Sequence, residues 1–268
     1  RANQLNIEKL SRVSHFNDQI RDGIKGSVFD SADTGFATGK PGSRNDVMAG
    51  IVGNVDYSTS ISTKWVTSYP GQSVNYVESH DNMTLVDKIK ASVKDAKPSD
   101  IAQLSQFSTS IAFLSQGLPF MQAGQEFLRS KNGDTNSYKS SDAINSLKWD
   151  TRKSNMATVN YYKGLIALRK AHPAFRMTTT EQVKSNLKFS NSPDGTIVYT
   201  LNGAAVKDKA ATIVVIHNAN VAEQSISLPK SGSWSVLVDN GKAGVSVIRK
   251  VTGDTLKVAG RTTVVLTQ

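Results

Sequence analysis

Cysteine is absent from the 268 residues of this sequence, and its absence excludes several classes of site at once. Disulfide bonds, thiolate zinc sites and cysteine nucleophiles cannot form. Histidine is scarce as well. The four histidines are far apart, and no two have the i, i+4 spacing of a helical metal site: His15, His80, His172 and His217. We therefore predict no metal site of these kinds.

Long apolar runs are also missing. No stretch of about 18 or more apolar residues occurs, so we expect no membrane-spanning helix. The first six residues, Arg1 to Asn6, lack the apolar core of a signal peptide. A hydrophobic content of 38% over 268 residues is nevertheless enough for one large domain or two ordinary ones with full cores.

The net charge of +10 raises the question of a nucleic-acid or other polyanionic partner. The excess is spread over the chain: residues 1–176 carry 22 Lys and Arg against 16 Asp and Glu, and residues 177–268 carry 10 against 6. The densest basic stretch, Lys88 to Lys97, is interrupted by Asp95. No basic run is interleaved with aromatic residues, so we favour an ordinary solvated surface and predict no nucleic-acid partner.

The spacing of apolar residues changes at about residue 177 and divides the chain in two. Before this point, helical spacing predicts helices over residues 44–52, 83–92, 101–116 and 156–169. After it, apolar and polar residues alternate in short runs separated by turns such as Asn-Gly and Asp-Gly. Such runs are typical of an antiparallel β-sandwich. We therefore expect an α/β domain over residues 1–176 and an all-β domain over residues 177–268.

Three strands predicted in the α/β part end in polar side chains. They cover residues 12–18, 73–79 and 118–122, and the polar groups at their ends are Asn17, Asp18 and Arg21, then His80 and Asp81, then Glu126 and Arg129. A (β/α) barrel presents its functional groups at the C-terminal ends of its strands, so these side chains are candidates for one pocket. About eight strands close such a barrel, and roughly three are present here. The residues by themselves predict an open fragment whose sheet has an unpaired side.

The segment Tyr76-Val77-Glu78-Ser79-His80-Asp81-Asn82 is similar to the fourth conserved region of the α-amylase superfamily. Its surroundings resemble the type I pullulanases, which are starch-debranching members of that superfamily. The other matching segments are residues 16–29 (the sixth-strand segment), residues 124–129 and 136–138 with Asn145 and Trp149 (the eighth-strand loop), residues 161–170 (the last barrel helix) and residues 260–266 (the final strand of the C-terminal β domain). The match covers nearly the whole chain, and the ordered set is far more specific than His-Asp-Asn alone.

The resemblance implies an α/β plus all-β fold, in which a partial (β/α)8 TIM barrel, about strands 6–8, precedes the antiparallel β-sandwich. It also implies hydrolysis of α-1,6-glucosidic bonds in pullulan, branched starch or glycogen, with retention of configuration. That reaction needs a nucleophilic carboxylate and a second carboxyl group as acid and base, about 5–5.5 Å apart. The family carries both on strands upstream of every segment matched here. We therefore expect this chain alone to be catalytically inactive.

Among the residues present, the resemblance assigns one catalytic group, Asp81, which would bind the hydroxyls of the sugar at the cleavage point and stabilise the transition state. The predicted substrate-binding residues are His80, Asn82, Arg129, Asn136 and Tyr138. For Arg129, a structural ion pair with Glu126 that braces the eighth-strand loop is an equally good interpretation. For Asn136 and Tyr138, ordinary packing of a long polar loop is also open. Asn17, Asp18 and Arg21 are better interpreted as a buried polar network.

Three functions remain open from the sequence: part of a debranching enzyme, a non-catalytic α-glucan-binding fragment, or a structural piece that binds polyanions or cell wall. The expected partners are an α-glucan (pullulan, starch or glycogen) and the missing N-terminal half of the same enzyme. No cofactor is called for by the residues; calcium is common in the family, but the sequence shows no complete ligand loop. The resemblance alone indicates an extracellular or cell-surface location, since the chain shows no export signal.

Overall fold

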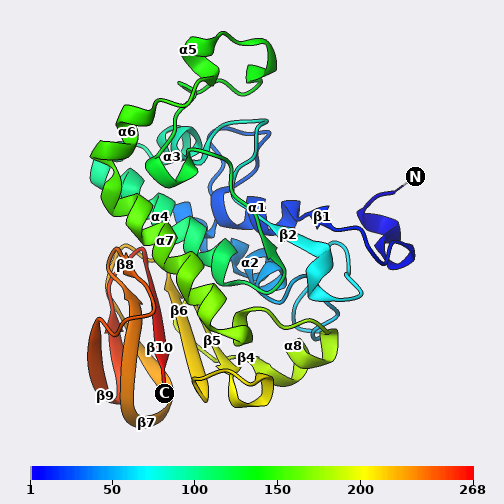
Figure 1. Cartoon of the computed structure of the whole chain (residues 1–268), viewed down its shortest axis with the longest axis vertical. Coiled ribbons are helices and arrows are strands. Elements are labelled where there is room, and N and C mark those ends of the chain that lie inside the picture. The colour runs from blue at the N-terminus through cyan, green and yellow to red at the C-terminus, as the bar shows by residue number, and fades with distance from the viewer. Residues whose placement is uncertain (1) are drawn as a thin grey trace.

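The computed structural model describes residues 2–268, except for the side chain of Pro41, and contains two regions that differ in secondary structure. The first consists of helices around a small parallel sheet, and the second is an antiparallel sheet packed beneath the two long helices α4 (Pro98–Leu114) and α7 (Met156–Ala171) (Figure 1). Helical structure continues through α8 (Thr180–Asn186), and the antiparallel sheet begins at Leu187, so the change in structure falls later in the chain than the change in sequence pattern at about residue 177.

The parallel sheet has three strands, β1 (His15–Phe16), β2 (Ser73–Asn75) and β3 (Leu118–Pro119), in the order β1-β2-β3. Both pairings are parallel. Single hydrogen bonds continue each pairing for one residue, from Asn17 N to Val74 O at 2.9 Å and from Phe120 N to Asn75 O at 2.9 Å. The strands are shorter than the sequence predicts: β2 ends before the buried Tyr76 and Val77, and β3 ends before Phe120.

The helices predicted over 44–52, 83–92, 101–116 and 156–169 are confirmed as α2 (Arg44–Ile51), α3 (Leu85–Ser92), α4 and α7. Two hydroxyl pairs join α4 to α7: Thr109 with Tyr162 at 2.6 Å, and Ser110 with Tyr161 at 2.7 Å. All four of these side chains are buried, so each hydroxyl finds its partner inside the core.

A further helix, α1 (Asp18–Lys25), begins where the sequence pattern predicts the polar end of the strand over residues 12–18. The side chain of Asn17 caps it by accepting a hydrogen bond from Ile20 N at 3.1 Å. Ile20 and Ile24 then lie four residues apart on the buried face. The prediction of a strand over residues 12–18 was therefore wrong beyond Phe16, because the Asn17 cap begins a helix at once.

Short helical segments connect these elements. They are η1 (Gln4–Lys9), η2 (Phe36–Thr38), η3 (Pro41–Ser43), η4 (Pro70–Gln72), η5 (Gln125–Phe127), η6 (Ser137–Lys139), α5 (Asp142–Asn145), α6 (Trp149–Ser154), η7 (Pro173–Phe175), α8 (Thr180–Asn186) and η8 (Ala204–Val206). The long polar segment 130–150 is therefore broken into turns by η6, α5 and the start of α6.

The second region is an antiparallel sheet of seven strands. They are β4 (Leu187–Phe189), β5 (Thr196–Asn202), β6 (Thr212–Asn218), β7 (Gln224–Asp239), β8 (Lys242–Ala243), β9 (Arg249–Val258) and β10 (Thr262–Thr267). The strand order is β4-β5-β6-β10-β7-β8, and β9 also pairs with β7. The antiparallel prediction is confirmed.

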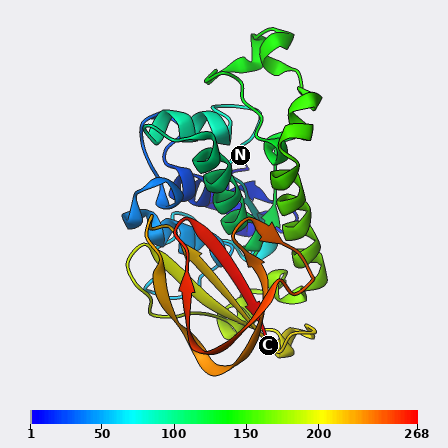
Figure 2. The same cartoon turned by 90° about the vertical axis from the view of Figure 1, so that its left-hand side faces the viewer.

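Strand β7 is long enough to take part in both layers of the antiparallel region, so the region differs from the predicted sandwich. It is one strand over two separate alternating runs of the sequence, residues 225–228 and 234–238, and its register against β9 shifts between Ser227 and Gly232. Buried residues from the far side of the shift, such as Ile226 and Leu256, share a core with Val214 and Leu266 from the other strands. Two layers thus enclose a core, but one continuous sheet supplies both, instead of two separate sheets (Figure 2).

The two regions share a second, larger core. Phe107 and Ile111 of α4 belong to the same buried cluster as Ile213 and Val265 of the antiparallel sheet. A buried polar link lies nearby: Asp208 accepts hydrogen bonds from Ala174 N at 3.1 Å and Ala210 N at 3.0 Å, and it pairs with His172 Nδ1 at 2.7 Å. The two regions thus share one continuous core.

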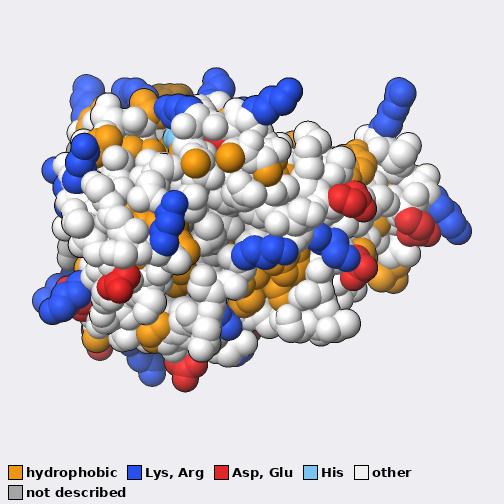
Figure 3. All heavy atoms as spheres, turned by 90° about the horizontal axis from the view of Figure 1, so that it is seen from below, with side chains coloured by type: hydrophobic (Ala, Val, Ile, Leu, Met, Phe, Trp, Pro, Cys, Tyr) orange, Lys and Arg blue, Asp and Glu red, His pale blue; other side chains and the backbone are white. Residues whose placement is uncertain are grey.

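Within the described part of the chain, no helix has both the length and the apolar character to cross a membrane. On the face drawn in Figure 3, Lys and Arg side chains are scattered singly among hydrophobic and acidic ones. That distribution fits the solvated positive surface favoured by the sequence.

Candidate functional site

The polar ends of the parallel strands meet around one open cavity of about 680 Å³. Its walls come from α1 and the loop after it, from the segment between β2 and α3, and from the loop after η5. The lining residues are Arg21, Lys25, Val28, Phe29, Ser31, Asp81, Asn82, Met83, Lys88, Thr135 and Asn136. Carboxyl ends of parallel strands meet at one edge of a sheet, which is why these segments converge.

The segment Tyr76–Asn82 is held from below by Glu78. This side chain is 2% exposed and accepts a hydrogen bond from Leu85 N at the start of α3. The amide of Gln122 lies on the other side and, with its nitrogen facing them, donates to Glu78 Oε1 at 3.1 Å and to Ser79 O at 2.7 Å. Asn82 then adopts a left-handed backbone conformation with φ of 60°, a conformation that asparagine tolerates well. The turn therefore presents Asp81 and Asn82 outward.

Asp81 carries the negative charge of this rim. The hydroxyl of Ser79 donates to its carboxylate, and this bond is the main reason why the pKa of Asp81 is lowered. The nearby His80 and Arg21 lower it further. Asp81 is exposed to solvent, so its carboxylate is ionised at neutral pH and open to a ligand.

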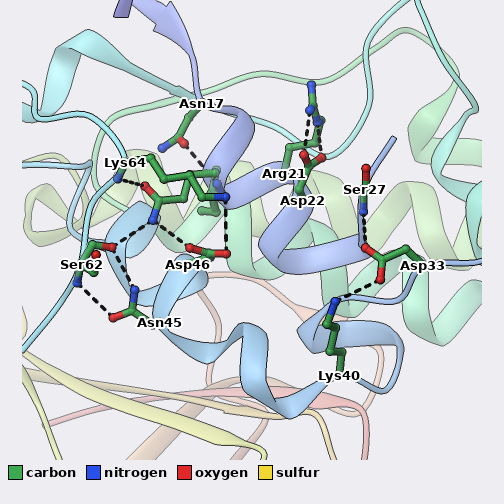
Figure 4. Close-up of polar contacts among 12 residues, drawn as sticks. Asn17, Arg21, Asp22, Ser27, Asp33, Lys40, Asn45, Asp46, Ser62 and Lys64 are labelled. Atoms are coloured by element: carbon green, nitrogen blue, oxygen red, sulfur yellow. Dashed lines mark hydrogen bonds and ion pairs between the residues drawn. The ribbon is translucent and has the colours of Figure 1, made fainter. Parts of the chain in front are cut away.

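Arg21 forms the wall opposite. Its Nε and Nη2 donate to the two oxygens of Asp22 at 2.7 and 3.0 Å, and its Nη1 donates to Tyr76 Oη at 2.8 Å. Figure 4 shows the Arg21–Asp22 pair on α1. Planar guanidinium groups bound on several sides are rigid. Arg21 is thus a fixed positive group rather than a mobile surface charge.

Below this rim lies a buried pair of ionisable groups, Lys25 and Glu78. Burial lowers the pKa of Lys25 to about 8, with the carboxylate of Glu78 opposing the shift. Burial likewise raises the pKa of Glu78 to about 7, against the effects of Leu85 N and Lys25. The protonation of Lys25 and Glu78 therefore depends on the charges close to them beneath the cavity.

The loop after β3 is tied to this segment through Lys131. The carboxylate of Asp87 on α3 accepts hydrogen bonds from Ser130 Oγ and from Lys131 N, the latter at 2.7 Å. Lys131 Nζ in turn donates to His80 O at 2.8 Å and to Ser137 Oγ at 2.7 Å. Thr135 and Asn136, which directly precede Ser137, line the cavity. These bonds fix the position of Asn136 relative to Asp81.

Three of the predicted site residues share the cavity, and three do not line it. Asp81, Asn82 and Asn136 are brought together. His80 is exposed outside the lining, and it contributes its carbonyl to the Lys131 contact. Tyr138 is 72% exposed on the outer side of the loop.

Arg129 braces the eighth-strand loop, which is one of the two roles that the sequence left open for it. It donates through Nη1 to Ala123 O at 3.3 Å and through Nη2 to Asn145 O, so it joins the two ends of the eighth-strand loop. Among residues 2–268 it makes no ion pair with Glu126, which instead accepts from Gly124 N at 3.0 Å. The brace uses backbone carbonyls rather than a carboxylate.

Lys25, Phe29 and Lys88 line the cavity but were not predicted as site residues. Lys25 belongs to helix α1 and Phe29 to the loop after it, whereas Lys88 belongs to α3. Arg21 and Lys25 lie four residues apart on one helical face, and Phe29 follows on the next turn of chain. The Gly-rich composition of residues 23–42 hid this helix, so the spacing had no meaning in the sequence alone.

Of the three residues predicted to form a buried polar network, Asn17 alone does so, because Asp18 is half-buried and accepts from Gln4 Nε2 at 3.1 Å, and Arg21 lines the cavity. Asn17 Nδ2 donates to Asn54 Oδ1 at 2.9 Å, Ser73 Oγ at 2.9 Å and Asn75 Oδ1 at 3.2 Å. Every partner is buried, so the network holds β1 and β2 in register rather than reaching a ligand.

No group of three or more His, Cys, Asp or Glu side chains within the described residues is arranged to hold a metal ion. The calcium ion that the resemblance left open stays a prediction, because calcium also binds backbone and amide oxygens, which are outside this group of side chains.

Comparisons with known proteins agree with this fold. A family model described as the pullulanase all-beta domain matches residues 183–242. The curated pullulanase of Bacillus subtilis (strain 168) is 37% identical over 234 residues, which cover 87% of this chain and 32% of that protein.

Solved structures match over the full length of the chain. The type I pullulanase of Bacillus subtilis str. 168 in complex with maltose has a TM-score of 0.92 at 35% identity and covers 100% of this chain, which covers 37% of that one. The pullulanase of Paenibacillus barengoltzii in complex with maltohexaose and alpha-cyclodextrin has a TM-score of 0.90 at 39% identity, with 100% of this chain and 40% of that one covered.

These similarities make the chain a relative of the starch-debranching glycoside hydrolases. Within that class, the resemblance to the type I pullulanases is confirmed. The chain spans 32% of the length of the curated Bacillus subtilis relative that it matches.

Proposed function

We propose that residues 1–176 form about strands 6–8 of a (β/α)8 barrel and that residues 177–268 form the β domain that follows it. The support is the parallel, sequential order β1-β2-β3 and the helix or helical segment after each strand. The exposed side of the sheet supports it too, since Phe16 and Leu118 are 47% and 46% exposed there. In a closed barrel these side chains would pack against further strands.

The function that this site supports best is a share in the retaining hydrolysis of α-1,6-glucosidic bonds in pullulan, branched starch or glycogen. The observation that carries this proposal is an ionised, exposed Asp81 held beside Asn82 and Asn136 at the rim of one cavity. A carboxylate and two amides can accept from and donate to vicinal sugar hydroxyls. Asp81 would favour the distorted ring of the sugar at the cleavage point, and exposed His80 is free to contact the same sugar.

The chain by itself lacks a second carboxylate for this reaction. A retaining mechanism needs two carboxyl groups about 5–5.5 Å apart. Among the described residues, Asp81 is the one carboxylate that lines the cavity. Glu78 is buried beneath it and occupied by Leu85 N. The nucleophile and the general acid would therefore come from a partner polypeptide that carries the remaining barrel strands.

Two measurements on pullulan test this proposal. The pure 268-residue chain is expected to release no reducing sugar, and addition of a polypeptide with the missing strands is expected to restore release. In that mixture, Asp81→Asn should lower the rate by about 10²-fold or more, which corresponds to a few kcal/mol of transition-state stabilisation. Asp150→Asn, whose side chain is 97% exposed, is the matched control and should change nothing. Activity of the chain alone, or full activity of the Asp81 variant, would contradict the proposal.

The α-glucan partner is supported by the relatives solved with maltose and with maltohexaose. The alternative of a non-catalytic glucan-binding fragment predicts binding without any partner and no activity in the reconstituted mixture. The polyanion alternative predicts retention on heparin that falls steeply with salt. An extracellular or cell-surface location, which accords with polymeric substrates, is part of the same proposal.

A further inference from the structure

We propose that Asn132 is a site of spontaneous deamidation, and that the fold selects it from the three Asn-Gly pairs of the chain. These pairs are Asn132-Gly133, Asn202-Gly203 and Asn240-Gly241. Asparagine is a thermolabile residue, and a following glycine leaves its side chain open to the next backbone nitrogen because glycine has no Cβ. The three pairs carry the same sequence signal, so any difference in their reactivity comes from the structure around them.

The reaction is an attack of the Gly133 backbone nitrogen on Cγ of the Asn132 side chain. A bond forms between these two atoms, the bond from Cγ to Nδ2 breaks, and Nδ2 leaves as ammonia with the proton from Gly133 N. Water then adds to one of the two carbonyl carbons of the resulting cyclic imide and opens the ring. The product is aspartate or isoaspartate at residue 132, and the reaction requires neither an enzyme nor a redox partner.

Asn132 and Gly133 meet the requirements for this attack. Both residues are exposed, and they form the centre of a turn closed by a hydrogen bond from Asp134 N to Lys131 O at 3.1 Å. Asn132 N donates to Ser130 Oγ at 3.0 Å, but within the described chain no group is bonded to the Asn132 side-chain amide or to Gly133 N. A Cβ added to Gly133 would meet no atom within 4 Å. The attacking nitrogen and its target are thus free to approach each other.

Asn202-Gly203 is protected by its contacts. Gly203 N donates to Ala211 O at 2.9 Å, and the side-chain oxygen of Asn202 accepts from Ala205 N at 3.4 Å. Gly203 is also buried, and a Cβ on it would collide with Ala210 O. Both reacting groups must therefore leave a hydrogen bond, by a local opening of the structure, before they can meet.

Asn240-Gly241 lies between these two cases. Both residues are exposed and have positive φ, as in the first pair. This turn, however, joins the paired strands β7 and β8. Strand β8 also packs so closely on α7 that a Cβ on Gly164 would collide with Ala243 O. The backbone rotation that brings the nitrogen to Cγ must therefore disturb a hairpin that is held on both strands.

The position of Asn132 gives the reaction a structural consequence. Isoaspartate routes the backbone through the side chain and adds one carbon atom to it between residues 132 and 133. The turn between Lys131 and Asp134 cannot keep its hydrogen bond with this insertion. Because Asp134 also accepts from Asn136 N at 2.8 Å, the segment that leads to the cavity wall loses support. The reaction itself needs neither a glucan nor a partner chain, so it goes beyond the proposed function.

The test is ageing of the full 268-residue chain in buffer at mildly alkaline pH. Peptide mass spectrometry follows the gain of one mass unit at each Asn-Gly pair, and protein isoaspartate methyltransferase labels the isoaspartate product. Asn132 should deamidate faster than Asn202 by about tenfold or more, with Asn240 between them. Asn132→Gln should remove the early isoaspartate signal, whereas Asn202→Gln, the matched control, should leave it.

Ageing of the same chain in urea separates the effect of the fold from that of the sequence. The three pairs should then deamidate at similar rates, because the contacts that distinguish them are lost. Asn202 reacting as fast as Asn132 in the folded chain would overturn the proposal, and so would the same spread of rates in the folded and the unfolded chain. Amide hydrogen exchange over residues 133–137 should accelerate in chains with isoaspartate at residue 132. Unchanged exchange there would overturn the structural consequence.

Discussion

The two sheets of this chain differ in length, polarity and completeness. Strands of the parallel sheet have two or three residues, whereas β7 of the antiparallel sheet has sixteen. The parallel sheet leaves Phe16 and Leu118 half exposed, but the antiparallel sheet buries Trp234 and Val236 completely. The segments that follow the short strands supply the residues that line the cavity. The comparison indicates that the antiparallel sheet contributes most to stability, while the parallel sheet positions the segments whose side chains line the cavity.

The largest effect should follow from breaking the antiparallel core. Trp234→Ala removes a fully buried side chain and should lower the free energy of unfolding by about 3–5 kcal/mol. Phe16→Ala, on the parallel sheet, removes a side chain that is 47% exposed and should cost about 1 kcal/mol or less. Urea unfolding followed by circular dichroism measures both. Equal losses would mean that the two sheets contribute alike to stability.

A somewhat smaller effect should follow from cutting the polar link between the regions. Asp208→Ala leaves His172 Nδ1, Ala174 N and Ala210 N without their acceptor, at an expected cost of about 2–4 kcal/mol. Because the core is continuous, we expect one shifted transition in calorimetry rather than two. Exposed Asp150→Ala serves as control and should leave the transition in place. Two separate transitions in the unaltered chain would show that residues 1–176 and 177–268 unfold independently.

The buried pair beneath the site should make stability depend on pH. Glu78 has a pKa of about 7 in the folded protein, above its ordinary value of 4.5, because of burial. Between these two values the folded state retains a proton that the unfolded chain has released, so stability falls as pH rises from about 4.5 to 7. Glu78→Gln should match the unaltered protein near pH 4.5 and be more stable by about 1–3 kcal/mol at pH 7.5.

The same measurement on Glu8→Gln, an exposed glutamate, should show no such divergence. The comparison is confined to pH 4.5–7.5 because Lys25 titrates at about pH 8. A Glu78→Gln variant that loses stability with pH in parallel with the unaltered protein would refute the buried-carboxyl explanation.

The smallest effect should come from the loop brace. Arg129→Ala removes the bonds to Ala123 O and Asn145 O, so amide hydrogen exchange across residues 130–145 should accelerate by about tenfold. Global stability should change by about 1 kcal/mol or less. Lys153→Ala, with a side chain 84% exposed, is the control. Unchanged exchange with weakened glucan binding would instead favour the role of Arg129 as a substrate ligand.

The sequence predicts those elements of the fold that have a clear apolar period and clear start and stop signals. Helix α4 begins at Pro98 and has a clear apolar period, so it was predictable. Helix α1 was not, because its eight residues include Gly23 and adjoin a Gly-rich stretch. The continuous antiparallel sheet also escaped prediction, since pairing partners are set by contacts that are distant in sequence.

The site was partly predictable for the same reason. Asp81, Asn82 and Asn136 belong to motifs that the resemblance covers, and they meet in one cavity. Lys25 and Phe29 lie in the matching segment over residues 16–29, but the resemblance assigned no site role to them, and their positions follow from helix α1 and the loop after it. His80, Arg129 and Tyr138 were assigned by motif membership, which does not determine whether a side chain faces a cavity.

The place of β10 in the antiparallel sheet has a consequence for the order of folding in time. Strand β10 lies between β6 and β7, although both precede it in the chain. Until β10 arrives, β4-β5-β6 and β7-β8-β9 are two separate pieces, each with an open edge. The pairings of β10 with β6 and β7 therefore join the two pieces, and they form after the other strands have been made. During synthesis, these two edges stay available for wrong pairings until Thr262–Thr267 inserts, which marks this interval as the one most exposed to aggregation.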